Sequence, residues 1–144
     1  KKAIESFTIF MQRYPASTRT DDCKARILEL QEKLVEKSYL SARLYYDLKE
    51  YRAATVSLAN SLKEYPDTKY REELMFLKLD ALYLLAGNSI PDKKVERFQT
   101  ALDEYYSFIE EFPQSRFSRD VARIFENTAK FLKVDTTVQQ TVNN

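Results

Sequence analysis

A four-residue phrase occurs three times in this chain: an aromatic residue, a proline, one further residue and then a serine or threonine. The copies run from Tyr14 to Ser17, from Tyr65 to Thr68 and from Phe112 to Ser115. An alanine and a larger apolar residue stand at matching distances before the three prolines, namely Ala3 and Phe7, Ala54 and Leu58, and Ala101 and Tyr105. Such self-similarity is typical of a solenoid, in which each unit buries its apolar face against its neighbours. We therefore predict an all-α chain of stacked helical hairpins.

The composition agrees with a folded, helix-rich chain. Apolar residues make up 44% of it and charged residues 31%, with one glycine and four prolines. A net charge of +1 provides no global field that attracts nucleic acid, so no nucleic-acid partner is predicted. The longest apolar run, Ala81 to Ala86, is too short to cross a bilayer. Because the chain starts in helical spacing without an initiator methionine, we interpret it as a fragment of a longer protein.

The residue types that common catalytic and metal sites need are scarce. Histidine is absent, which excludes His-based triads and imidazole zinc sites within these residues. The single glycine, Gly87, cannot build a glycine-rich phosphate loop. Cys23 is the only cysteine and is expected to be a buried, unreactive thiol. No catalytic, cofactor-binding or metal-binding residue is therefore predicted.

Prolines divide the chain into helices, because a proline ends a helix at about the residue before it. The pattern predicts a half repeat over residues 1–14, hairpins over about 17–65 and 68–112, a last helix over about 115–132 and an irregular tail over 134–144. The long helix that ends near Asp47 would measure about 40 Å at about 1.5 Å per residue. Residues 1–133 are expected to form one helical-repeat domain.

Short polar side chains near the expected helix starts are suited to N-caps, because their oxygens accept hydrogen bonds from unpaired backbone N–H groups. The expected caps are Ser17 or Thr18, Thr68, Asp92 and Ser115. Gly87 and Asn88 offer a C-terminal stop to the helix that precedes Asp92.

The segment from Ala42 to Ala54, which leads to Tyr65 and Pro66, resembles a tetratricopeptide repeat in the spacing of its small, aromatic and proline residues. The chain's prolines recur at intervals of 51 and 47 residues, instead of the standard interval of about 34, which indicates extra turns in each unit. Long first helices with this phrase resemble the C-terminal repeats of the BamD family, the lipoproteins of outer-membrane protein assembly. The insertion from Leu85 to Val95 is similar to versions from the Bacteroidetes group.

This resemblance implies tetratricopeptide-like hairpins stacked in a right-handed superhelix, an α-solenoid. It also implies a non-catalytic scaffold on the periplasmic face of the outer membrane, held there by an N-terminal lipid anchor that lies outside this sequence. The implied partners are the periplasmic domains of the β-barrel insertase BamA and accessory assembly lipoproteins, with unfolded outer-membrane proteins as further candidates. No cofactor is implied.

Two other functional classes remain open. Another envelope repeat adaptor, such as a Tol-associated cell-division coordinator, shares the aromatic-proline phrase, although its repeats usually stay close to the standard length. An enzyme that uses the solenoid as a specificity module would need a catalytic domain outside these residues. The long first helix favours the BamD family over the coordinator.

The first candidate binding surface consists of Tyr39, Arg43 and Tyr46. Standard repeat positions place these side chains toward the groove of a solenoid, and tyrosine and arginine are enriched at the centres of binding interfaces. The alternative is structural: the tyrosines pack against the neighbouring hairpin and the arginine pairs with a nearby carboxylate.

The second candidate surface is a stripe of Arg116, Arg119 and Arg123 on the last helix, where spacings of three and four place side chains on one side. These guanidinium groups are suited to an acidic partner surface. Alternatively, Asp120 pairs with Arg116 and Arg123 within a solvated terminal helix.

Overall fold

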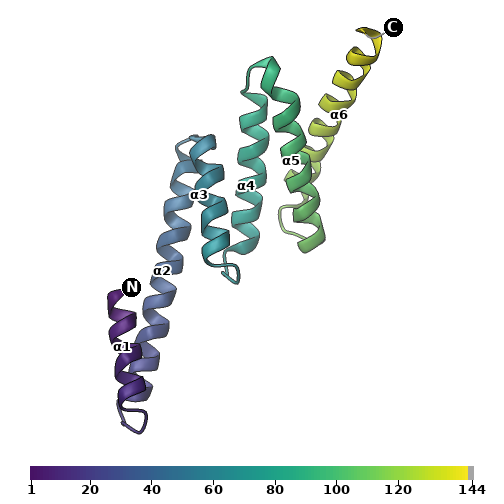
Figure 1. Ribbon diagram of the computed structural model, residues 1–144. Helices are drawn as coiled ribbons and strands as arrows, with labels where there is room; N and C mark the ends of the chain where they lie inside the picture. The colour runs from purple at the N-terminus through teal and green to yellow at the C-terminus, as the bar shows by residue number, and fades with distance from the viewer. Residues whose placement is uncertain (143–144) are drawn as a thin grey trace. The chain divides into compact units, whose positions relative to one another are not determined.

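The computed structural model describes residues 1–142, and these residues form helices and no strands. The helices are α1 (Lys2–Arg13), α2 (Thr20–Asp47), α3 (Tyr51–Glu64), α4 (Arg71–Gly87), α5 (Pro91–Glu111) and α6 (Ser118–Val142) (Figure 1). Each of the helices α3, α4 and α5 packs on the helix that follows it in the chain, as Figure 1 shows. The predicted all-α fold of stacked, tetratricopeptide-like hairpins is thereby confirmed.

The chain divides into two compact units, Lys1–Leu40 and Ser41–Asn144. The first unit holds α1 and the first three-quarters of α2, and the second holds the end of α2 and the four helices after it. One continuous helical-repeat domain over residues 1–133 therefore stays a prediction.

The repeated phrase forms the same turn at each of its three positions. The aromatic residue leaves helical geometry while its N–H still bonds a carbonyl four residues back, at 2.8 to 2.9 Å. Two residues after each proline, a hydroxyl accepts a hydrogen bond from the N–H two positions on: Ser17 from Arg19, Thr68 from Tyr70 and Ser115 from Phe117. Repeated sequence thus gives repeated geometry.

These turns correct the predicted helix starts. Ser17, Thr68 and Ser115 do not cap the helices directly, because α2, α4 and α6 begin three residues further on. The hydroxyls are instead used inside the turn, as the preceding hydrogen bonds show. Asp92 is not a cap either: α5 begins at Pro91 after an extended Ile90, and Asp92 lies in its first turn. Proline suits the first helical position, which has no intrahelical partner for an N–H.

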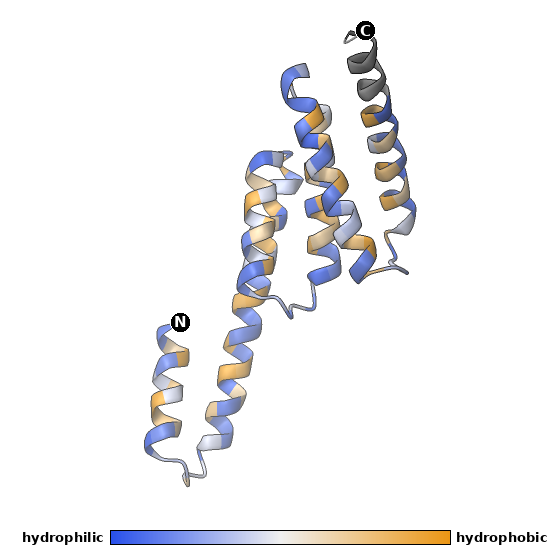
Figure 2. Cartoon of the chain, turned by 45° about the vertical axis from the view of Figure 1, so that its right-hand side comes forward, coloured by the Kyte–Doolittle hydropathy of each residue, from blue (hydrophilic) through white to orange (hydrophobic). Residues whose placement is uncertain are grey.

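The core of the second unit lies between α4, α5 and α6. Met75, Leu79, Phe108, Val121 and Ile124 form its buried cluster. Helix α4 is central, since every one of its residues except Gly87 is buried or half-buried. Figure 2 shows apolar and hydrophilic residues alternating along the helices of this unit, as expected of amphipathic helices that bury one stripe.

Helix α6 continues to Val142, where the sequence predicts an irregular tail from residue 134. No proline or glycine follows Lys133 to end the helix, and β-branched residues reduce helix propensity by only a few tenths of a kcal/mol each, about 0.5 at most. The lack of a helical apolar pattern after residue 133 therefore did not end the helix, because no proline or glycine interrupts it there. Asn143 and Asn144 lie outside the described residues.

Candidate functional site

The boundary between the two units falls within α2, so the first candidate surface is divided between them. Tyr39 belongs to the first unit, where its side chain is buried at 7% exposure. Cys23, in the same unit, is also buried, as predicted. A side chain with so little accessible area offers a partner little to contact.

Arg43 joins the end of α2 to α4. Its Nη1 lies 3.2 Å from Oε1 of Glu73, and its Nε lies 3.7 Å from Oδ2 of Asp47. The Arg43 side chain remains 46% exposed, so it has both an internal carboxylate partner and a surface that solvent reaches.

Tyr46 also connects the end of α2 to α4, through a contact that is more buried than that of Arg43. Its hydroxyl donates a hydrogen bond of 2.5 Å to Oδ2 of Asp80, a carboxylate that is 8% exposed on α4. Burial and this hydrogen bond together raise the pKa of the Tyr46 phenol well above its ordinary value, because both disfavour the phenolate. The ring also meets Tyr51 edge to face, with centroids 6.1 Å apart.

Arg43 and Tyr46 therefore have the contacts that the structural alternative expects: each engages an acidic residue of the neighbouring hairpin. Partner binding by Tyr39, Arg43 and Tyr46 stays a prediction. The sequence analysis did not identify Glu73 and Asp80 as partners, because they lie 30 and 34 residues after Arg43 and Tyr46. Spacing along one helix reports only pairs three or four residues apart.

In the second candidate surface, only two of the three predicted arginines lie on the last helix, because α6 begins at Ser118. Arg116 lies in the turn before α6, with its guanidinium carbon 4.7 Å from the ring centroid of Phe117. Arg119 and Arg123 lie on α6 and are exposed. Arg123 is 3.7 Å from Asp120, which bears out half of the predicted pairing. All three arginines are exposed, although Arg116 lies over Phe117 and Arg123 lies beside Asp120.

Hydrogen bonds and an ion pair connect the start of α4 to the third copy of the repeated turn, and we call this set of residues the polar junction: Arg71, Glu72, Glu111, Ser115 and Arg116. The carboxylate of Glu72 accepts hydrogen bonds from the Ser115 hydroxyl at 2.6 Å and from the Arg116 N–H at 3.3 Å. Arg71 forms a two-bond ion pair with Glu111, one bond measuring 3.0 Å, which raises the pKa of the guanidinium. The sequence analysis did not predict this junction, because Glu72 and Ser115 lie 43 residues apart along the chain.

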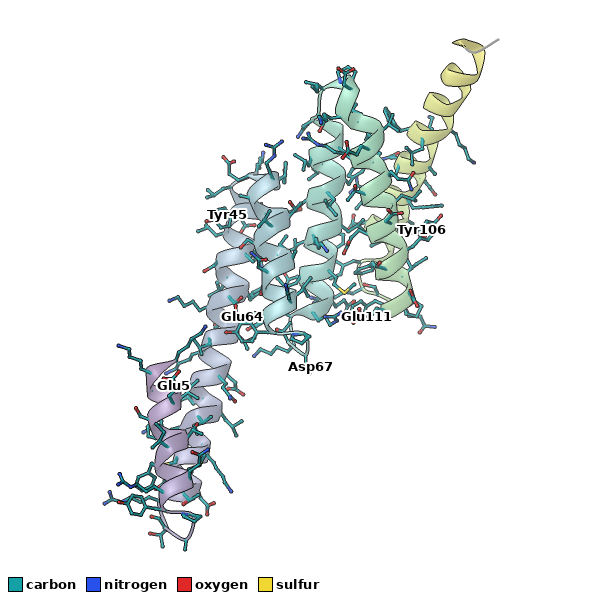
Figure 3. The ribbon with its side chains drawn as sticks, viewed as in Figure 1. Glu5, Tyr45, Glu64, Asp67, Tyr106 and Glu111 are labelled. Atoms are coloured by element: carbon teal, nitrogen blue, oxygen red, sulfur yellow. The ribbon has the colours of Figure 1, made fainter. Side chains whose placement is uncertain are left out.

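The junction borders a groove of about 630 Å³ at one end of the hairpins. Its lining includes Asp67 from the turn between α3 and α4 and Glu111 from the end of α5, which Figure 3 shows at the same end of the unit. Three charged side chains of this lining, Arg71, Glu72 and Glu111, are engaged in the bonds of the junction. Within the described residues, no cluster of potential metal ligands occurs, and no helix has the length and apolar character needed to cross a membrane.

Comparison with known proteins gives two findings. A family described as "YfiO: Outer membrane lipoprotein" matches residues 1–97 and, in a second alignment, residues 45–141. The second match begins 44 residues after the first, an interval close to the 51 and 47 residues that separate the prolines of the repeated turns. The chain is also 30% identical over 81 residues to the outer membrane protein assembly factor BamD of Vibrio cholerae serotype O1. That alignment covers 56% of this chain and 34% of the relative, about a third of its length.

Proposed function

The chain belongs to the YfiO family of outer-membrane lipoproteins, and from this premise we propose that it is a non-catalytic scaffold for the assembly of outer-membrane proteins. The family match over residues 1–97 and 45–141 is the observation that carries the proposal. The similarity to an assembly factor from Vibrio cholerae supports the same role.

The proposed mechanism is binding without chemistry. Stacked hairpins hold their exposed side chains at fixed spacing, and partners bind to the surface that these side chains form. We propose that the periplasmic domains of BamA are the principal partner, with accessory assembly lipoproteins as further partners and unfolded outer-membrane proteins as clients. The proposed location is the periplasmic face of the outer membrane, through an N-terminal lipid anchor of the full-length protein.

Among the candidate surfaces, Arg119 and Arg123 support docking best. Both are exposed on α6, whereas Tyr39 is buried and Tyr46 is engaged with Asp80. Arginine is favoured at protein interfaces because its planar fork of donors binds carboxylates with two parallel bonds. We propose that these two arginines meet an acidic surface of BamA. Arg43, still 46% exposed, is a separate candidate contact on α2.

Two finer assignments belong to the same proposal. The chain represents the C-terminal repeats of such a scaffold, because the repeated turns and the long α2 resemble that region. The insertion around Ser89 is taken as a mark of the Bacteroidetes version.

The proposal is tested by affinity purification from envelope extract with this chain as bait and partners identified by mass spectrometry. Recovery of BamA is the expected result. Recovery of Tol proteins or peptidoglycan-synthesis proteins without BamA would move the assignment to the Tol-associated coordinator. A bait with Arg119→Glu/Arg123→Glu keeps the buried cluster of α4, α5 and α6 and shows whether capture depends on these two exposed arginines.

A further inference from the structure

A cluster of three aromatic rings lies on the surface between α5 and α6. Tyr105 stacks on Phe125 with centroids 4.5 Å apart, Tyr106 meets Phe125 edge to face at 6.4 Å, and the two tyrosine rings are 5.4 Å apart. Tyr106 is 50% exposed. Figure 3 shows Tyr106 on α5, beside α6.

The repeat register shows that packing does not require an aromatic ring at position 106. Tyr106 stands seven residues before Pro113, and the equivalent positions before the other two repeat prolines hold Thr8 and Ala59. The position before it is different: Tyr105 is equivalent to Leu58, which is fully buried, and to Phe7. Tyr105 therefore occupies a packing position, while Tyr106 adds an exposed ring that the other copies of the same helix lack.

Carboxylates flank this exposed ring on its own helix. Asp103 lies three residues before Tyr106 and Glu110 four residues after it, spacings that place all three side chains on one face of α5. Both acids are exposed. Asp103 accepts a long hydrogen bond of 3.4 Å from Gln99. Within the part of the chain that the structure describes, neither acid forms an ion pair, so neither charge is neutralised by a cation.

On α6, the residues that border Phe125 are small, so they leave room for a partner's side chain beside the ring. Ala122 and Ala129 are three residues before Phe125 and four residues after it, so small side chains border the ring on its helix face. Aromatic faces carry negative potential and attract a cation that lies within about 6 Å of the ring centroid. Nearby carboxylates add to this attraction and repel anionic partners.

We propose that Tyr105, Tyr106, Phe125, Asp103 and Glu110 form a binding site for arginine or lysine side chains of an extended basic segment in a partner protein. The charge complementarity between the flanking acids and a cationic side chain selects this occupant over an apolar one. The proposal rests on α5 and α6 alone and does not depend on the proposed role in outer-membrane assembly.

The test is an NMR titration of this chain at low ionic strength with a synthetic peptide of four Gly-Arg-Ser units. A peptide of four Gly-Glu-Ser units serves as the charge-reversed control. We expect the arginine peptide to bind and to shift the amide signals around Tyr106 and Phe125, and the glutamate peptide to leave them unchanged.

Variants then locate the binding. Tyr106→Ala removes the cation–π attraction, and Asp103→Asn/Glu110→Gln removes the carboxylate charges. Each variant should therefore lower the affinity for the arginine peptide about fivefold or more. Tyr106→Leu keeps apolar bulk against Phe125 and should show the same loss. Tyr45→Ala is the matched control, since Tyr45 is 43% exposed on α2 of the same unit and should leave affinity unchanged.

Three results would overturn the proposal: no binding of the arginine peptide, equal binding of the glutamate peptide, or equal affinity of the parent and Tyr106→Ala. Equal binding of both peptides would assign the cluster to an apolar occupant. A circular-dichroism melt of each variant ensures that affinity is compared between folded proteins.

Discussion

The phenol of Tyr46 on α2 donates its hydrogen bond to the carboxylate of Asp80 on α4. Asp80 is 8% exposed, so water has little access to this oxygen. The bond joins one hairpin to the next and fixes their register at a buried point. A buried carboxylate without such a donor is costly, because its hydration is lost without replacement.

Tyr46→Phe should therefore lower the free energy of unfolding by about 1–3 kcal/mol, the cost of leaving a buried polar group without its partner. Urea denaturation followed by circular dichroism measures this change. Tyr45→Phe is the control, because Tyr45 is 43% exposed, and its change should stay within about 0.5 kcal/mol. Equal stabilities of the two variants would show that Asp80 has another donor.

The same pair predicts a loss of stability in alkaline solution. The folded pKa of Tyr46 is raised above the unfolded value, so the unfolded chain releases this proton first and stability falls as the pH rises above about 10. Below that pH the contribution is fully present. The pKa of Tyr65 is also raised, mainly by burial, so Tyr46→Phe should remove part of the decline and not all of it. Denaturation curves at successive pH values above neutrality measure the difference between parent and variant.

Much of the helical framework could be predicted from the sequence, because a proline ends the helix before it through its own ring and needs no distant partner. The residues before Pro15, Pro66 and Pro113 end α1, α3 and α5 with nearly the same backbone angles. The helix starts were harder to predict, since a serine or threonine hydroxyl serves a turn or a cap equally well. Only the positions of the neighbouring N–H groups distinguish the two uses.

The side-chain roles were less predictable than the helices. Position within a repeat assigns Arg43 and Tyr46 to a surface, yet their partners Glu73 and Asp80 come from a helix that lies one hairpin further along the chain. Tyr106 illustrates the opposite case. Comparison of equivalent positions across the three repeats could have singled it out, because it replaces Thr8 and Ala59 with an aromatic residue.

The junction around Glu72 gives a third prediction. Glu72→Ala removes the acceptor of the Ser115 hydroxyl and the Arg116 N–H, and it should reduce the stability of the α6 attachment by about 1–2 kcal/mol. Hydrogen exchange of the first amides of α6 should become faster, by about a factor of five or more. The control is Glu126→Ala, an exposed acid on α6 itself. Unchanged exchange in Glu72→Ala would mean that apolar packing alone holds the start of α6.

Thr128 gives a prediction of opposite sign. Its hydroxyl is buried at 1% exposure and has no hydrogen-bond partner within the described residues. Thr128→Val keeps the shape and removes the unsatisfied group, so it should raise the free energy of unfolding by about 1 kcal/mol. Thr100→Val is the control, because Thr100 is exposed and bonds the Glu96 carbonyl. A destabilised Thr128→Val would indicate that a water molecule satisfies the hydroxyl.

Docking on BamA can be measured by isothermal titration calorimetry of this chain with the purified periplasmic domains of BamA. We expect saturable binding that weakens at least tenfold in Arg119→Glu/Arg123→Glu, because reversed charges in an interface cost well over about 1.4 kcal/mol. Arg52→Glu, an exposed change on α3, should bind like the parent. Absence of binding by the folded parent chain would contradict the assignment of this region as the part that docks on BamA.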